Sequence, residues 1–160
     1  MSWLLERVDD RLVHGQVVVA WGARLRPKRI WVVDDAASPW ERDLLAGAAP
    51  GIEVKVVTAA EAVDLYAKEH AAAGGAFLLL RDLATALRVV ESGAAIRSLN
   101  LGGLHYAPGK TKVNEYIYLD DADRATARRL RACGVTLEVQ DVPSSRAQSL
   151  DTLDPETAAP

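Results

Sequence analysis

The sequence predicts an α/β fold: a single open, mainly parallel sheet of about six to seven strands, with helices on both faces and one edge strand antiparallel. Short, nearly continuous apolar runs alternate with helical stretches along the whole chain. Apolar runs of this kind are typical of strands that are covered on both faces. The helical stretches begin and end at recognisable capping residues, which supports the same alternation of strand and helix.

Length and composition indicate one soluble globular domain. The chain has 160 residues, of which 49% are hydrophobic and 26% charged, the balance of an ordinary globular protein. We expect residues 1–153 to form this domain and the polar, proline-flanked residues 154–160 to form a flexible tail. The net charge of −3 argues against nucleic acid as a partner, because phosphate-binding proteins usually carry a basic excess.

The sequence also predicts a cytoplasmic protein that needs neither metal nor cofactor. Its one cysteine, Cys133, can form no disulfide within the chain and no thiolate cluster, which suits a reducing compartment. Acidic residues close to the N-terminus argue against a signal peptide. No apolar run approaches the ~20 residues that span a bilayer, so we expect no direct membrane insertion, although docking on a membrane protein remains open.

Seven apolar runs are the predicted strands. They are Trp3–Val8, Arg29–Asp34, Ile52–Val57, Ala76–Arg81, Ser98–Leu101, Tyr116–Leu119 and Val135–Val139. Residues 102–114 interrupt the alternation with a glycine pair, a Pro-Gly pair and two lysines, which predicts a long loop rather than a crossover helix. We therefore expect the strand after this loop, Tyr116–Leu119, to run antiparallel at an edge of the sheet.

Helix boundaries follow from capping residues. Val17–Leu25 is the first predicted helix, with Val17, Trp21 and Leu25 on one face. Two capping boxes, in which a hydroxyl residue precedes a glutamate by three positions, start later helices. Aspartates start the last two, and Gly93 and Gly134 end them. The predicted capping residues are Ser38, Thr58, Asp82 and Asp121.

The connection between the first strand and the first helix, residues 9–16, carries the candidate chemistry. Open α/β sheets bind ligands at the carboxyl ends of their strands. His14 and Gly15 fall at the helix start, where backbone N–H groups attract an anion such as phosphate. Arg11 adds a guanidinium group whose donors match phosphate oxygens. A histidine in this place, largely neutral at pH 7, is a competent nucleophile for a phosphoryl group.

The same spacing also allows a purely structural interpretation. A histidine near a helix start can be a cap or a partly buried polar residue. Asp9 and Asp10 can simply end the strand and solvate the loop, and Arg11 can pair with them. The two apolar residues before the histidine can surround it as a contact surface or anchor the loop inward.

Two separated segments resemble one known family. The first is RVDDRLVHGQVVVAWG (residues 7–22), which closely resembles the active-site segment of the IIB component of the mannose–fructose–sorbose family of the phosphoenolpyruvate-dependent sugar phosphotransferase system (PTS). The second is SLNLGGLHYAPGKTKVN (residues 98–114), which resembles that family's Asn-x-Gly-Gly…Gly-Lys loop. WVVDD (residues 31–35) and the chain length also fit, and the resemblance covers about residues 3–153.

The resemblance implies that the chain is a phosphotransferase component. His14 would take phosphate, on Nδ1, from a phosphohistidine of the IIA component. It would then pass the phosphate to a sugar taken up through the membrane components IIC and IID. Arg11 would steady the phosphoryl oxygens. These components and the sugar are the implied partners.

Further residues receive lesser roles. Gly15 and Gln16 would supply backbone N–H groups to the phosphate, and Lys110, in the Gly-Lys pair, would help to offset its charge. The resemblance also places Asp10 in the active loop, as a brace rather than a base. His105 lies in the second segment at a position where several relatives have no histidine, so we expect it to be peripheral.

Two other functions fit the same residues. One is a phosphate- or nucleotide-sensing module without turnover, and the other is a phosphoryl carrier with a regulatory target instead of a transported sugar. The chain has no Walker A sequence, and Gly102-Gly103 does not open a helix as a dinucleotide fingerprint would. Dimers are common in the family and the sheet has edges to cover, so we also expect a homodimer.

Overall fold

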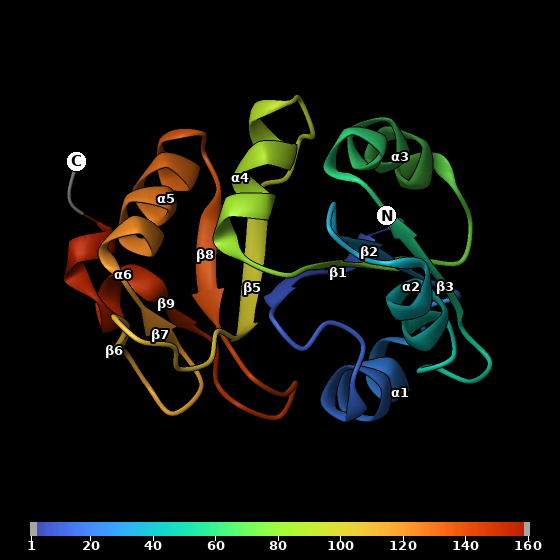
Figure 1. The fold of residues 1–160 in the computed structure, drawn as a ribbon, viewed down its shortest axis with the longest axis horizontal. Helices are drawn as coiled ribbons and strands as arrows, with labels where there is room; N and C mark the ends of the chain where they lie inside the picture. The colour runs from blue at the N-terminus through green and yellow to red at the C-terminus, as the bar shows by residue number, and fades with distance from the viewer. Residues whose placement is uncertain (1–2, 159–160) are drawn as a thin grey trace.

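The computed structural model, which describes residues 3–158, contains a seven-stranded sheet with helices on both faces (Figure 1). The strands of this sheet are β1 (Trp3–Asp9), β2 (Arg29–Val33), β3 (Glu53–Val57), β4 (Ala76–Leu80), β5 (Ser98–Gly103), β8 (Thr136–Val139) and β9 (Gln148–Ser149). Their order is β3-β2-β4-β1-β5-β8-β9. All neighbours run parallel except β8 and β9. The predicted fold class is confirmed.

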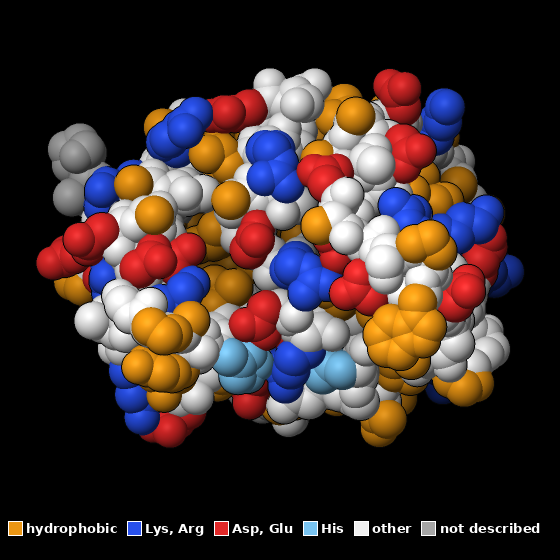
Figure 2. Space-filling model, in the orientation of Figure 1, with side chains coloured by type: hydrophobic (Ala, Val, Ile, Leu, Met, Phe, Trp, Pro, Cys, Tyr) orange, Lys and Arg blue, Asp and Glu red, His pale blue; other side chains and the backbone are white. Residues whose placement is uncertain are grey.

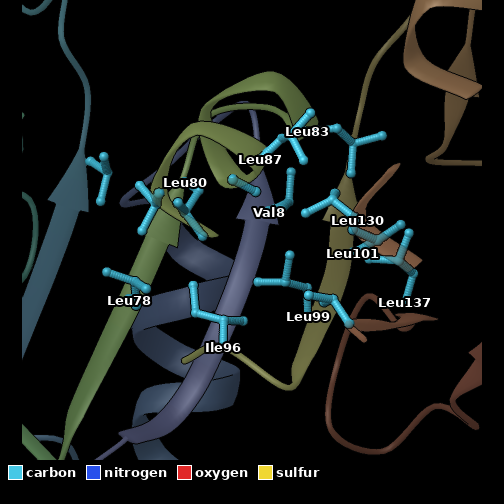
Figure 3. Packing of buried hydrophobic residues seen from close by; sticks show 14 of the residues in the cluster. Val8, Leu78, Leu80, Leu83, Leu87, Ile96, Leu99, Leu101, Leu130 and Leu137 are labelled. Atoms are coloured by element: carbon cyan, nitrogen blue, oxygen red, sulfur yellow. The ribbon is translucent and has the colours of Figure 1, made fainter. Parts of the chain in front are cut away.

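The helices divide between the two faces. They are η1 (Gln16–Trp21), α1 (Gly22–Leu25), α2 (Pro39–Ala46), α3 (Ala59–Ala71), α4 (Leu83–Glu91), α5 (Asp121–Ala132), α6 (Leu150–Leu153) and η2 (Pro155–Thr157). In Figure 1, α3, α4 and α5 lie on one side of the sheet and α1 and α2 on the other. Each side has its own apolar core. In Figure 3, Leu83 and Leu87 of α4 point toward Val8 of β1 within the larger core.

The capping predictions are confirmed at three helices and wrong by one residue at the fourth. Both capping boxes form, and Asp82 accepts a hydrogen bond from the N–H of Thr85. At α5 the cap is Asp120, whose carboxylate accepts from the N–H of Asp123 at 2.8 Å. Asp120 keeps an extended backbone while Asp121 is already helical. Either aspartate can cap, and backbone conformation decides between them.

The predicted antiparallel edge strand Tyr116–Leu119 is wrong in its pairing. Its last two residues form β7 (Tyr118–Leu119), which pairs with β6 (Thr111–Lys112) in a separate two-stranded ribbon. The side chain of Asn114 accepts hydrogen bonds from two backbone N–H groups of the turn between these strands. The chain therefore folds back on itself, and Ile117 meets the end of β5 through an isolated parallel bridge to Leu104. The antiparallel edge strand of that sheet is β9.

The expected flexible tail packs against α5 as far as Ala158. Asp154 starts η2 and pairs with Arg124 of α5, with 2.7 Å between Oδ2 and Nε. Thr157 is 1% exposed. Residues 159–160 lie outside the described residues.

The strand order reverses its direction at the carboxyl end of β1. The chain leaves β1 toward the face that carries η1, α1 and α2. It leaves the two neighbouring strands, β4 and β5, toward the opposite face. Connections that depart in opposite directions from adjacent parallel strands open a space between them, where ligands of open α/β sheets bind. The loop with His14 lies at this point.

Candidate functional site

The site begins with a buried ion pair in the central strand. Arg7 and Asp9 are two residues apart in β1, so their side chains leave the same face of the sheet. Both side chains are completely buried, and Arg7 Nη2 lies 3.1 Å from Asp9 Oδ2. A buried charge is tolerated only with a partner and further hydrogen bonds. The rest of the site supplies these bonds.

Strand β5, the segment after β8 and η1 hold the guanidinium group of Arg7. Its Nη1 donates to the side chain of Asn100 at 2.5 Å and to the carbonyl of Gln140 at 3.0 Å. Its Nη2 donates to the carbonyl of Asp141 at 3.0 Å. The ring of Trp21 lies 5.5 Å from its central carbon, and the indole N–H donates to the same Asp141 carbonyl. Arg7 is thus a fixed part of the scaffold.

The glycine pair at the end of β5 makes room for the two arginines. A Cβ on Gly102 would lie 1.7 Å from Cζ of Arg7. A Cβ on Gly103 would lie 3.0 Å from Arg11 Nη2 and 3.0 Å from Asp9 Oδ1. Any side chain at Gly102 would therefore displace Arg7, and one at Gly103 would crowd the contact between Arg11 and Asp9.

Arg11 binds Asp9 from the other side. Its Nε donates to Oδ1 at 3.0 Å and its Nη2 to Oδ2 at 2.9 Å, a two-pronged contact that fixes the plane of the guanidinium group. Its Nη2 also donates to the side-chain oxygen of Gln16 at 3.1 Å. Burial raises the pKa of Asp9, but Arg11, Arg7 and His14 outweigh it and the pKa falls below its ordinary value. Asp9 is therefore ionised at neutral pH.

His14 lies against this network. Its Nδ1 donates to the carbonyl of Leu12 at 2.8 Å. Its Nε2 is buried without a hydrogen-bond partner, 3.7 Å from Asp9 Oδ2, and the side chain is 18% exposed. Burial lowers the pKa of His14 below 6.5, although the Leu12 carbonyl and the Asp9 charge oppose this effect. The imidazole is therefore neutral at pH 7.

Leu12, whose carbonyl contacts the histidine ring, has an unusual backbone conformation. Its φ is 55°, in the left-handed region that leucine rarely adopts and that costs energy. Its side chain is 1% exposed, and that of Val13 is 6% exposed, both in the core beneath η1. Of the two interpretations of these apolar residues, the inward anchor is therefore correct. Their burial stabilises the strained loop.

The helix after His14 starts at Gln16 and is π-helical in its first six residues rather than α-helical. Gly15 stands at its N-cap position and is exposed. The side chain of Gln16 accepts a hydrogen bond from Arg11 and helps to place it. The sequence predicted only a backbone contact from Gln16 to phosphate. π-Helical turns are rare and concentrate at functional sites.

Asp10 joins the first loop to the second. Its carboxylate accepts from the backbone N–H of His105 at 2.7 Å and from His105 Nδ1 at 2.6 Å. These side chains are partly exposed, 33% for Asp10 and 46% for His105. His105 Cε1 and Arg11 Nη2 both lie 3.0 Å from the position that a Cβ on Gly103 would take. His105 and Arg11 thus both border Gly103.

Lys110 lies further along the second loop. Its Nζ pairs with Asp123 Oδ2 at 2.8 Å, at the start of α5. Burial lowers the pKa of Lys110, but the bond to Asp123 and the nearby charges of Asp120 and Asp10 raise it overall. The structure therefore brings His14, Arg11 and Gln16 together. Lys110 forms its ion pair with a residue of α5. In Figure 2, histidine, acidic and Lys or Arg side chains gather along the lower part of the face shown.

Three features of the site were not predicted from the sequence: the roles of Arg7 and Asn100 and the burial of Asp9. Opposite charges two residues apart in a central apolar strand were the available signal, because such residues share one buried face. Within residues 3–158, no three His, Cys, Asp or Glu side chains are grouped so that they could hold a metal ion. Over the same residues, no helix is both long and apolar enough to cross a bilayer.

Comparison with known proteins decides the family. Residues 3–158 match the family described as "PTS system sorbose subfamily IIB component". The chain belongs to this family. The sorbose-specific EIIB component of Klebsiella pneumoniae is 35% identical to this IIB chain over 147 residues, which are 90% of each protein.

Another relative is longer than this IIB chain. The mannose-specific EIIAB component of Escherichia coli (strain K12) is 38% identical over 141 residues, which are 86% of this chain and 44% of that protein. This IIB chain therefore spans less than half the length of that relative.

Solved structures agree with the family. The crystal structure of the IIBSor domain of the sorbose permease from Klebsiella pneumoniae matches with a TM-score of 0.87 at 33% identity, over 98% of both chains. The N-acetylgalactosamine-specific IIB component 1 of Escherichia coli matches with a TM-score of 0.84 at 31% identity, over 92% of this chain and 99% of that one.

Proposed function

We propose that this IIB chain is a cytoplasmic phosphoryl carrier in sugar uptake. His14 accepts a phosphoryl group on Nδ1 from a phosphohistidine of a IIA component and passes it to a sugar taken up through IIC and IID membrane components. The observation that carries this proposal is the neutral, partly exposed imidazole of His14 beside the paired Arg11. Because the chain belongs to the PTS IIB family, we interpret this geometry as a phosphoryl-acceptor site.

The charge of the site suits the proposed cargo. Two arginines and one aspartate, Arg7, Arg11 and Asp9, leave a net charge of +1 around the imidazole. A phosphoryl group carries about two negative charges, and its transfer needs mainly alignment and charge stabilisation. Arg11 is 33% exposed, so it can bind Asp9 and still face an incoming phosphoryl group.

Sugar transport is favoured over the two alternatives by what the relatives are called. The related proteins are named as mannose-, sorbose- and N-acetylgalactosamine-specific components. A sensing module would bind phosphate without forming a bond to His14. A regulatory carrier would form the bond but would not release the phosphate to a sugar.

We also propose that the carrier is a homodimer, for which light scattering at micromolar concentration should give twice the chain mass.

A two-stage assay tests the proposal. In the first stage the chain is incubated with radioactive phosphoenolpyruvate, the general PTS proteins and a matching IIA. We expect one acid-labile phosphate per chain, absent when IIA is omitted. A stable chain with no adduct would contradict the carrier function and support the sensor.

The second stage adds membranes that contain the matching IIC and IID components together with each candidate sugar. We expect one sugar to discharge the phosphoprotein rapidly and to be recovered as sugar phosphate. An adduct that no sugar discharges, with membranes active toward another IIB, would support the regulatory carrier instead.

A further inference from the structure

The two transfers of the proposed function differ in what happens to a proton. A histidine attacks phosphorus through a lone pair on a ring nitrogen and gives up no proton in doing so. A sugar hydroxyl carries a proton, which must leave when its oxygen bonds to phosphorus. Phosphoryl-transfer sites hold a group that orients such a hydroxyl and accepts its proton. A base can therefore accelerate the second transfer and have no part in the first.

Asp9 is a poor candidate for this base, although its Oδ2 lies only 3.7 Å from His14 Nε2. Its side chain is fully buried, and both of its oxygens accept hydrogen bonds from arginine side chains. These contacts lower the pKa of Asp9 below its ordinary value, so its carboxylate holds a proton weakly. The base must come from another part of the site.

His105 has the contacts of a histidine base. Its Nδ1 lies 2.6 Å from Asp10 Oδ1, and its backbone N–H donates to Asp10 Oδ2 at 2.7 Å. An ionised carboxylate can only accept, so Nδ1 carries a proton, and a neutral ring then has its lone pair on Nε2. Over the described part of the chain, Nδ1 is the only ring nitrogen of His105 with a hydrogen bond. A carboxylate that holds one ring nitrogen leaves the other to act on a substrate.

His105 borders the same small space as Arg11. Its Cε1 lies 3.0 Å from the position that a Cβ on Gly103 would take, and Arg11 Nη2 lies 3.0 Å from the same point. The two atoms are therefore separated by no more than twice this distance, and Nε2 is bonded to Cε1. Both side chains are partly exposed, 33% for Arg11 and 46% for His105. A hydroxyl that approaches a phosphoryl group held by Arg11 would thus come within reach of His105.

We infer that His105 is the general base of the second transfer, in which its Nε2 accepts the proton of the sugar hydroxyl that attacks the phosphoryl group on His14. This inference rests on the proposed function and adds a catalytic residue to it. Asp10 is the positioning residue that fixes the ring of His105. The role belongs to this chain, because several relatives have no histidine at this position.

The step balances without another reactant. The hydroxyl oxygen forms a bond to phosphorus while the N–P bond to His14 breaks, and that electron pair returns to the ring of His14. The hydroxyl proton moves to Nε2 of His105, whose ring becomes positively charged. The carboxylate of Asp10 stabilises this charge through Nδ1–H. Loss of the proton to water then restores the base.

The variant His105→Asn tests the inference. Its amide can still donate to Asp10, but it cannot act as a base. Wild type and variant are charged with radioactive phosphate by phospho-IIA, purified, and mixed with membranes that contain IIC, IID and the sugar that discharges the wild type. We expect charging within about fivefold of the wild-type rate and transfer to the sugar slower by roughly a hundredfold or more.

Two controls separate a base from a structural contact. Return of phosphate from the charged variant to IIA is a transfer between histidines and should keep its wild-type rate. The matched control variant is His70→Asn, which removes another exposed histidine at the end of α3. This helix end leads into the start of β4, at the opposite edge of the sheet from His105. His70→Asn should leave both transfers unchanged.

Two outcomes would overturn the inference and leave the proposed function intact. One is transfer from His105→Asn to the sugar at the wild-type rate, which would mean that a membrane component supplies the base. The other is equal slowing of the transfers to the sugar and back to IIA, which would mean that His105 only shapes the site. If His105→Asn does not fold, His105→Gln is measured by the same criteria. A wild-type protein that forms no adduct would instead contradict the proposed function, and the inference with it.

Discussion

Asp9 and Asp10 are adjacent in the sequence, yet they lie in opposite surroundings. Asp9 is fully buried between Arg7 and Arg11 and faces His14. Asp10 is 33% exposed and pairs with His105 on the neighbouring loop. Asp9 is the last residue of β1 and Asp10 lies in the turn that follows it, so one step along the chain separates the two roles. The comparison teaches that the buried carboxylate organises the site, whereas the exposed one joins its loops.

The largest effect should come from the histidine that lies against the buried network. His14→Ala should abolish phosphorylation by phospho-IIA, because it removes the proposed acceptor. The urea midpoint should change little, since the side chain is partly exposed and its Nε2 has no hydrogen bond. Labelling and urea unfolding of the same preparation check both statements. Stable labelling of His70 or His105 in this variant would contradict the assignment.

Next in size is the loss of the buried cation. Arg7→Met leaves the carboxylate of Asp9 buried with one partner fewer, so the free energy of unfolding should fall by about 3–5 kcal/mol. The matched control is Arg88→Met, because Arg88 pairs with Asp35 while both are substantially exposed. Such a pair contributes about 0–1 kcal/mol. Similar losses in the two variants, measured by urea unfolding, would mean that Arg7 is not an essential support of Asp9.

Arg11→Lys separates charge from geometry at the edge of the buried network. Lysine keeps the charge but loses the two-pronged contact with Asp9. Losing ~1.5–3 kcal/mol of transition-state stabilisation should slow transfer about tenfold to a hundredfold. The free energy of unfolding should fall by less than in Arg7→Met, because lysine keeps the positive charge beside buried Asp9. Single-turnover kinetics and urea unfolding give both numbers. Unchanged transfer with a strongly lowered midpoint would make Arg11 a structural residue.

The smallest expected effect is a pH dependence of stability. The pKa of His14 lies below 6.5 in the folded protein. Above pH 6.5 the imidazole is neutral in both states. As pH falls below 6.5, the unfolded chain binds a proton first, so wild type should lose stability relative to His14→Gln. Urea unfolding of both proteins between pH 7.5 and about 5 measures this difference. A difference that grows in the other direction would mean that the folded protein favours charged His14.

Local sequence patterns predicted the sheet and most helix starts because each depends on a few neighbouring residues. Ser38 with Glu41, and Thr58 with Glu61, form capping boxes irrespective of the rest of the chain. The two-residue strands β6 and β9 are too short for such a pattern. At α5, two adjacent aspartates left the start uncertain by one residue.

The sequence allowed us to predict several residues of the site, but not the hydrogen bonds and ion pairs between them. The place of His14 and Arg11 at the first strand–helix connection follows from the strand and helix patterns. The burial of Asp9 does not, because an aspartate after an apolar run usually marks a solvated loop. The left-handed backbone of Leu12 contradicts local preference and is maintained by tertiary packing. Lys110 stays a predicted phosphate contact; its ion pair with Asp123 was not predictable, because Asp123 lies on a helix that begins later in the sequence.

The comparison of Asp9 with Asp10 supplies the most direct test of the account. Asp9→Asn and Asp10→Asn remove the same charge from adjacent positions, and single-turnover phosphorylation by phospho-IIA measures the consequence of each. We predict that Asp9→Asn slows acceptance by roughly a hundredfold or more. Asp10→Asn should change it by less than about fivefold, because an exposed pair is worth only ~0–1 kcal/mol. Equal rates for the two folded variants, or a larger loss with Asp10→Asn, would contradict the central role of the buried carboxylate.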